Sequence, residues 1–167
     1  MPDPPSPSAF EDALRDALTD VLHKMFFIGA FADATPPEAG RELDPPAELA
    51  ARVHFHGEPS GDLLLVLNRQ AARGIAADFL GENRSCLTGR QIEEVFCELA
   101  NMICGAVLSR VESAATFYLA SPVIEPCADN PSRSETAKCV FPVGDAELTA
   151  SIWMEEPVCG PLEKSAC

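Results

Sequence analysis

Apolar side chains recur every three or four residues from about Leu87 to Val111. This period is typical of an amphipathic α-helix that turns one wide apolar face to the core. Thr88 and Gln91 stand three residues apart and fit a capping box at its start. We therefore predict one long helix here. Its core-facing stripe consists of Ile92, Val95, Phe96, Leu99, Met102, Ile103 and Val107.

Two further helices are predicted from the same kind of pattern. The first runs from Ala9 to about Phe27, with Ser8 and Glu11 as its capping box. The second is capped by Asn68, runs to Leu80 with Ala71, Ile75, Phe79 and Leu80 facing inward, and ends at Gly81. Apolar and polar residues alternate, or apolar runs occur, in five segments that we predict to be strands: 48–57, 62–67, 115–124, 136–142 and 147–154.

The order of these elements favours an α+β fold. A helix is followed by a strand hairpin, a short helix, the long helix and a three-stranded meander, so helices and strands are grouped rather than alternating. We expect a single domain over 8–155, in which two long helices and a shorter one cover a mostly antiparallel sheet. Residues 1–7 are rich in proline and are expected to be disordered, and 156–167 to form a flexible tail.

Composition narrows the classes of partner. The formal net charge of −14 argues against nucleic acid and anionic membranes. No apolar run approaches the ~20 residues of a membrane span, and the first residues do not resemble a secretion signal, so we expect a soluble cytoplasmic protein.

Seven cysteines without a C-x-x-C pair are interpreted as free thiols that fill apolar space, with a redox sensor at Cys97 and Cys104 as the alternative. His54 and His56 share a strand face, but no third metal ligand is signalled.

A polar ridge runs along the exposed side of the long helix. Glu94, Glu98, Asn101 and Gly105 stand at offsets of four, seven and eleven residues, which confines them to a sector of roughly 60°. Two acids at i,i+4 repel by a few tenths of a kcal/mol, so the ridge is not optimal for helix stability. It is interpreted as a contact surface for another molecule. The alternatives are ordinary solvation of the acids and, for Gly105, tight packing of helix on sheet.

The first helix carries a weaker copy of this spacing. Asp16, Asp20 and His23 are spaced like Glu94, Glu98 and Asn101, which suggests a domain with pseudo-twofold internal symmetry. In the first copy the amide is replaced by a histidine.

These residues resemble the CheC/CheX/FliY family of chemotaxis phosphatases, and the segment from Glu98 to Gly105 is closest to CheX. The family motif is an Asp or Ser, then Glu, then Asn, then a Pro some twenty residues later. It corresponds here to Glu94, Glu98, Asn101 and Pro122. The sequence departs from the motif at Glu94, whose part in function the motif leaves open. The copy with Asp20 and His23 lacks the Glu and Asn of a two-site member, which implies one active site.

The resemblance implies a phosphatase that hydrolyses the aspartyl phosphate of a CheY-like receiver domain. In that role Asn101 would orient the attacking water and Glu98 would pair with the receiver's lysine, while Glu94 and Gly105 would contact the partner. Mg²⁺ would come from the receiver, and the chain would need no metal or cofactor of its own. A homodimer is plausible in this family. The alternative is a non-catalytic, CheC/FliM-like binding module of a chemotaxis or flagellar switch assembly.

Overall fold

The computed structural model describes residues 6–25, 48–57, 60–111, 116–125 and 133–155. Within these residues the strands form one antiparallel sheet in the order β3-β1-β2-β6-β5, and β4 also pairs with β1. The helices are α1 (Pro7–Met25), α2 (Arg69–Leu80), the 3-10 turn η1 (Arg84–Cys86) and α3 (Gly89–Val111). The strands are β1 (Glu48–His56), β2 (Gly61–Asn68), β3 (Tyr118–Leu119), β4 (Val123–Glu125), β5 (Ala137–Val143) and β6 (Ala146–Met154).

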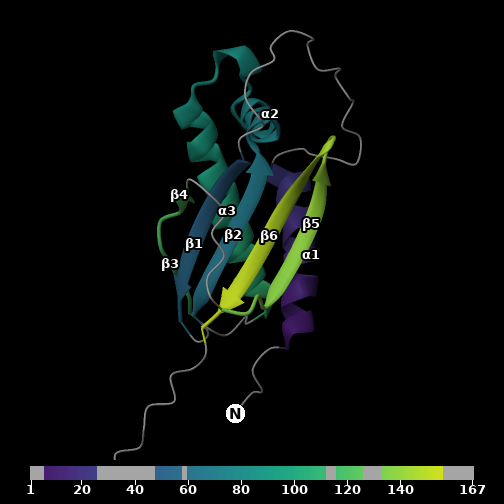
Figure 1. Cartoon of the computed structure of the whole chain (residues 1–167), viewed down its shortest axis with the longest axis vertical. Helices are drawn as coiled ribbons and strands as arrows, with labels where there is room; N and C mark the ends of the chain where they lie inside the picture. The colour runs from purple at the N-terminus through teal and green to yellow at the C-terminus, as the bar shows by residue number, and fades with distance from the viewer. Residues whose placement is uncertain (1–5, 26–47, 58–59, 112–115, 126–132, 156–167) are drawn as a thin grey trace, which may run out of the picture.

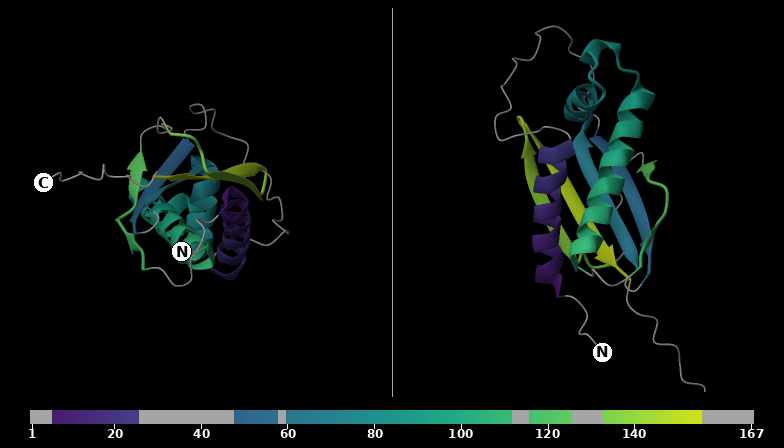
Figure 2. Two further views of the ribbon diagram at one scale, coloured as in Figure 1. Left: turned by 90° about the horizontal axis from the view of Figure 1, so that it is seen from below. Right: turned by 180° about the vertical axis from the view of Figure 1, so that it is seen from behind.

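The helices and the sheet form two layers. The two long helices, α1 and α3, lie side by side on one face of the sheet, and α2 lies beyond the end of β2 (Figures 1 and 2). The α+β fold with a mostly antiparallel sheet, two long helices and a shorter one is confirmed. None of the helices in the described part of the chain is long and apolar enough to cross a membrane.

The predicted helix caps are present at α2 and α3. The Asn68 side chain accepts hydrogen bonds from the first backbone amides of α2, and Gly81 ends that helix at φ 66°, where an L side chain would be strained. At α3 the Thr88 amide donates to Gln91 Oε1 at 2.9 Å, and the Gln91 amide donates to Thr88 Oγ1 at 3.3 Å. The two reciprocal bonds form a capping box, which explains why α3 begins where it does.

The start of α1 differs from the prediction. The helix begins at Pro7 rather than after Ser8, and the Ala9 amide bonds to the Ser6 carbonyl at 2.9 Å and to Ser6 Oγ at 3.4 Å. Ser6 therefore acts as the N-cap. Pro7 takes the first helical position, which suits a residue with fixed φ and no N–H to satisfy.

The predicted C-terminal meander is wrong. The segment expected as one strand over 115–124 is divided into β3 and β4, with Pro122 in the interruption, because proline has no N–H for the ladder. Both pieces pair with β1 at one edge of the sheet, whereas the β5–β6 hairpin forms the other edge. Phe79 and Leu80, expected to face inward, are among the exposed large apolar side chains.

The core lies between the sheet and the two long helices. From α3 it receives the predicted stripe, of which Met102 is half-buried and the other members are buried. These side chains pack against the inward side chains of the sheet and against α1, which lies beside α3 on the same face. The fully buried aliphatic partners include Leu14, Leu18 and Leu22 of α1 and Val53, Leu63 and Leu65 of the sheet. This packing fixes how α3 is turned about its axis.

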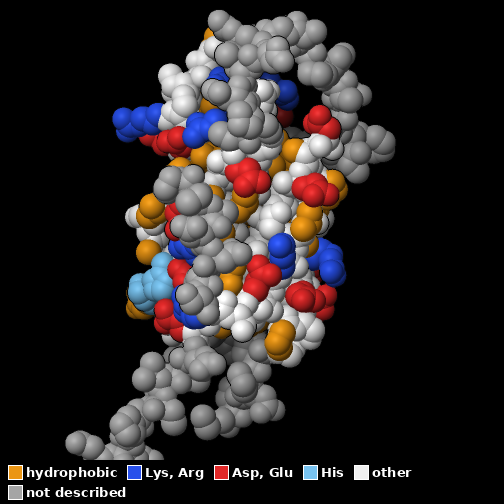
Figure 3. Space-filling view, viewed as in Figure 1, with side chains coloured by type: hydrophobic (Ala, Val, Ile, Leu, Met, Phe, Trp, Pro, Cys, Tyr) orange, Lys and Arg blue, Asp and Glu red, His pale blue; other side chains and the backbone are white. Residues whose placement is uncertain are grey.

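The face of the sheet opposite to α1 and α3 carries charged side chains (Figure 3), several of which form ion pairs. Arg52 of β1 donates from Nε and Nη2 to the two carboxylate oxygens of Glu125, at 2.6 and 3.1 Å. Asp62, only 8% exposed, is bound by His54 Nδ1 at 2.9 Å and by Arg133 Nη2 at 2.6 Å. A buried carboxylate with two such partners is compensated for the loss of water. The Arg52–Glu125 pair joins the end of β4 to β1, and the Arg133–Asp62 pair joins the segment before β5 to β2.

Truncation of the α3 stripe is expected to destabilise the whole domain. Leu99 is fully buried, so Leu99→Ala should lower the free energy of unfolding by about 2–5 kcal/mol through lost burial and a cavity. Leu80→Ala, at an exposed leucine of α2, is the matched control and should change it by about 0.5 kcal/mol or less. Urea unfolding followed by circular dichroism measures both, and equal effects would contradict the described core.

Candidate active site

The polar ridge lies on the outward side of α3. Glu94 and Glu98 are exposed, and Asn101 and Gly105 are half-buried. The buried stripe occupies the other side of the same helix, so the four ridge residues face away from the sheet. The structure thus brings all four sequence-predicted site residues together on one surface.

Asn101 and Glu98 have no polar partner in the part of the chain that the structure describes. Neither side chain makes a hydrogen bond or an ion pair with any residue that the structure describes. Glu94 differs, because its Oε1 accepts from Arg90 Nε at 2.7 Å, and this contact raises the pKa of the Arg90 guanidinium. The pair is exposed and one helical turn apart, so it contributes little to stability. Of the two acids on the ridge, Glu94 is therefore paired and Glu98 is unpaired among the described residues.

Gly105 has no steric reason within the described chain to be glycine. A Cβ built on it would meet no described atom within 4 Å, so the alternative that it permits tight helix–sheet packing is not supported. Glycine inside a helix costs about 1 kcal/mol relative to alanine. An open position at this cost is what a helix needs if another molecule approaches its backbone closely.

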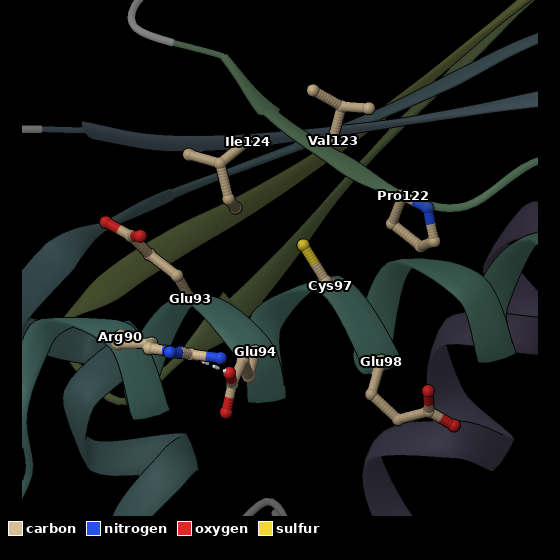
Figure 4. A pocket seen from close by; sticks show the side chains of 8 residues that line it. All are labelled: Arg90, Glu93, Glu94, Cys97, Glu98, Pro122, Val123 and Ile124. Atoms are coloured by element: carbon tan, nitrogen blue, oxygen red, sulfur yellow. Dashed lines mark hydrogen bonds and ion pairs between the residues drawn. The ribbon is translucent and has the colours of Figure 1, made fainter.

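A groove runs beside the ridge, between the first half of α3 and β4. It encloses about 520 Å³ and is open to solvent. Figure 4 shows the Cys97 sulfur and the Ile124 side chain directed into the space between helix and strand. This groove is not predicted by the sequence patterns; the one signal for it is Pro122, which the family motif includes. The groove is lined by Arg90, Glu93, Glu94, Cys97, Glu98, Pro122, Val123 and Ile124.

The copy of the motif in α1 is not equivalent to the ridge of α3. Asp20 accepts a hydrogen bond from Arg110 Nη2 of α3 and pairs with Lys24 at 3.4 Å. Its carboxylate therefore ties α1 to the last turn of α3. His23 and Asp16 are exposed. Asp20, which corresponds to Glu98, is thus already paired with two cationic side chains of the same chain.

Metal and thiol chemistry receive no support from the described residues. Among them no group of three or more His, Cys, Asp and Glu side chains could hold a metal ion, and His54 is bound to Asp62 rather than free for one. Cys104 is buried in the core, and burial raises its pKa to about 12. Burial and the charge of Glu93 also raise the pKa of Cys97. Both thiols are protonated at neutral pH and are poor nucleophiles.

Comparison with known proteins identifies the family. The model of the family "Chemotaxis phosphatase CheX" matches residues 49–139, which include all but the first residue of β1 and the whole of β2, α2 and α3 with its ridge. No curated protein matches the chain.

Solved structures of chemotaxis proteins share the fold. CheX in the CheX–CheY–BeF₃–Mg²⁺ complex from Borrelia burgdorferi superposes with a TM-score of 0.65 and 16% identity, covering 88% of this chain and 98% of that one. CheX from Vibrio vulnificus gives 0.63 and 17%, covering 87% and 96%. CheX from Desulfovibrio desulfuricans gives 0.63 and 19%, covering 87% and 99%. At these identities the likeness establishes the fold alone.

The family model, in contrast, matches more than half of the sequence and spans the helix that carries Glu94, Glu98, Asn101 and Gly105. The chain belongs to the chemotaxis phosphatase CheX family.

Proposed function

We propose that this protein is a cytoplasmic phosphatase that hydrolyses the aspartyl phosphate of a CheY-like receiver domain. The observation that carries the proposal is that Asn101 and Glu98 share an outward face of α3 and have no described partner within the chain, in a protein of the CheX family. Side chains that the fold does not use are available for a reaction on another protein.

Asn101 is proposed to orient the attacking water. Its amide oxygen accepts a hydrogen bond from the water, while its NH₂ group donates to the phosphoryl oxygens. Hydrolysis of a phosphoryl group depends on positioning and charge stabilisation rather than on a protein nucleophile, so an amide is sufficient for this task. A carboxylate at the same place would be repelled by the phosphoryl charge.

Glu98 is proposed to pair with the receiver's conserved lysine. It stands one helical turn before Asn101 on the same face, so one contact sets the position of the other. The ion pair also supplies a cation to a chain whose net charge is −14, which otherwise disfavours contact with the acidic phosphorylation site of a receiver. Mg²⁺ would be held by the receiver. The related Borrelia complex contains CheY, BeF₃ and Mg²⁺.

Gly105 is proposed to let the receiver approach the backbone of α3 closely. The space above it is open among the described residues, and it lies one turn beyond Asn101 on the same ridge. Glu94 is proposed to contribute at the other end of the ridge. Its existing bond to Arg90 makes it a weaker contact than Glu98.

Loss of the Asn101 amide should abolish hydrolysis without unfolding the protein. In Asn101→Ala the phosphorylated receiver is expected to decay at its intrinsic rate, because nothing then orients the water. Asn101→Asp, which replaces only NH₂ by O, should be equally inactive through charge repulsion. Decay of receiver labelled with acetyl phosphate measures the rate, and binding of the beryllofluoride-bound receiver checks that docking survives. Wild-type hydrolysis by Asn101→Ala would refute the proposal. Docking that leaves the phosphate lifetime unchanged even with the wild-type chain would favour the binding-module alternative.

Removal of the Glu98 charge should weaken docking and slow turnover. Glu98→Gln is expected to raise KM about tenfold and to lower kcat, because a charge-assisted contact of roughly 1.5–3 kcal/mol is lost. Glu94→Gln is the matched control on the same ridge and should change KM about twofold or less, since Glu94 already has Arg90 as its partner. Steady-state kinetics at low and moderate salt measure both variants. A larger loss for Glu94→Gln than for Glu98→Gln would reverse their assigned roles.

A methyl group at Gly105 should make the protein more stable but a poorer phosphatase. Gly105→Ala is expected to raise the free energy of unfolding by about 1 kcal/mol, because the site is helical and open. The same change should raise KM for the phosphorylated receiver by keeping it away from the helix. Chemical denaturation and kinetics on one preparation test both effects. A stabilised variant with unchanged KM would show that the receiver does not contact Gly105.

A further inference from the structure

Four of the eight residues that line the groove beside the ridge are uncharged and of low polarity, and they come from both α3 and the β4 segment. Pro122, Ile124 and Cys97 line it, and all three are half-buried. Burial and the neighbouring Glu93 carboxylate raise the pKa of the Cys97 thiol, so at neutral pH this side chain is an uncharged group of low polarity. An apolar side chain placed between α3 and β4 would therefore meet apolar atoms on both sides.

The acids at the rim of the groove are mostly neutralised by the chain itself. Glu93 pairs with Arg69 at 2.9 Å, and Glu94 pairs with Arg90 at 2.7 Å. Burying an unpaired carboxylate costs free energy because the charge loses its water. A ligand in the groove would avoid this cost at Glu93 and Glu94, since both are already paired. Glu98 is the exception, because it has no ion pair among the described residues. The groove is thus suited to an apolar group with one cation beside it.

The groove and the ridge form one continuous surface. At ~100° per residue, Cys97 lies about 40° round the helix from Asn101, and Glu98 lines the groove while also belonging to the ridge. A protein whose lysine meets Glu98 would therefore bring the residues next to that lysine over the groove. The two contacts would form together.

We propose that the groove receives an apolar side chain of the receiver domain, adjacent to the lysine that pairs with Glu98, and thereby selects which receivers dock. This inference rests on the proposed function. The groove is open in the free protein, and an apolar residue that docking removes from water there is the kind of contact that dominates binding energy at protein interfaces. Receivers with the lysine but with a polar residue beside it would bind weakly, and the catalytic step on Asn101 would be the same for all of them.

Cys97 provides a native probe of whether the groove is filled. Its alkylation by iodoacetamide, at mildly alkaline pH because of the raised pKa, should slow at least tenfold when Mg²⁺–beryllofluoride-bound receiver is present at saturation. Cys86 of η1 is exposed and does not line the groove, so it serves as the internal control and should react at an unchanged rate. Mass spectrometry of the labelled peptides gives both rates. If Cys97 reacts at its free rate while the receiver is bound, the proposal is wrong.

Kinetics separate this inference from the proposed function. Ile124→Ala should raise KM about fivefold with kcat unchanged, whereas Ile124→Leu should restore KM to near the wild-type value. Val140→Ala, at an exposed valine on β5 at the opposite sheet edge, is the matched control and should leave KM unchanged. An unchanged KM in Ile124→Ala would overturn the groove assignment. Only the behaviour of Asn101→Ala decides whether hydrolysis itself is as proposed.

Discussion

The burial of one side of α3 is the constraint on which the rest of the site depends. Leu99 and Ile103 are fully buried among side chains of the sheet and of α1. Because a helix is rigid, this contact determines the direction of every other side chain on it. Asn101 and Glu98 lie on the outward side of α3 because Leu99 and Ile103 occupy its buried side. Among the described residues, the outward direction of the Asn101 side chain thus follows from the packing of α3 and not from a hydrogen bond to that side chain.

The same constraint explains which parts of the molecule could be predicted from sequence. The caps at Thr88 and Asn68 and the outward ridge follow from residues three to eleven positions apart, and such local spacing is written directly in the chain. The pairing of β4 with β1 joins segments more than seventy residues apart, and no local pattern indicates it. The meander prediction failed for that reason, and the groove was missed because one of its walls is β4. Phe79 and Leu80, which the spacing predicted to face inward, are instead exposed at the last two positions of α2.

The relation between the two long helices was only partly visible in the sequence. The spacing of Asp16, Asp20 and His23 matched that of the α3 ridge, and it suggested a diverged copy. The hydrogen bond between Asp20 and Arg110 joins residues ninety positions apart, and no local pattern in the sequence predicts it. It gives the acid of α1 a structural task, which is to join the helices that enclose the core. A spacing shared by two helices therefore did not mean a shared role.

The ion pair between Arg52 and Glu125 has a consequence for the region around Asn101. Glu125 is the last residue of β4, and its carboxylate is bound by Arg52, which lies over Trp153 in the apolar cluster that is separate from the helix-facing core. Arg52 thus helps to hold β4, which forms one side of the groove, although Arg52 does not line the groove itself. The shape of the groove beside α3 therefore depends in part on an ion pair whose side chains do not line it.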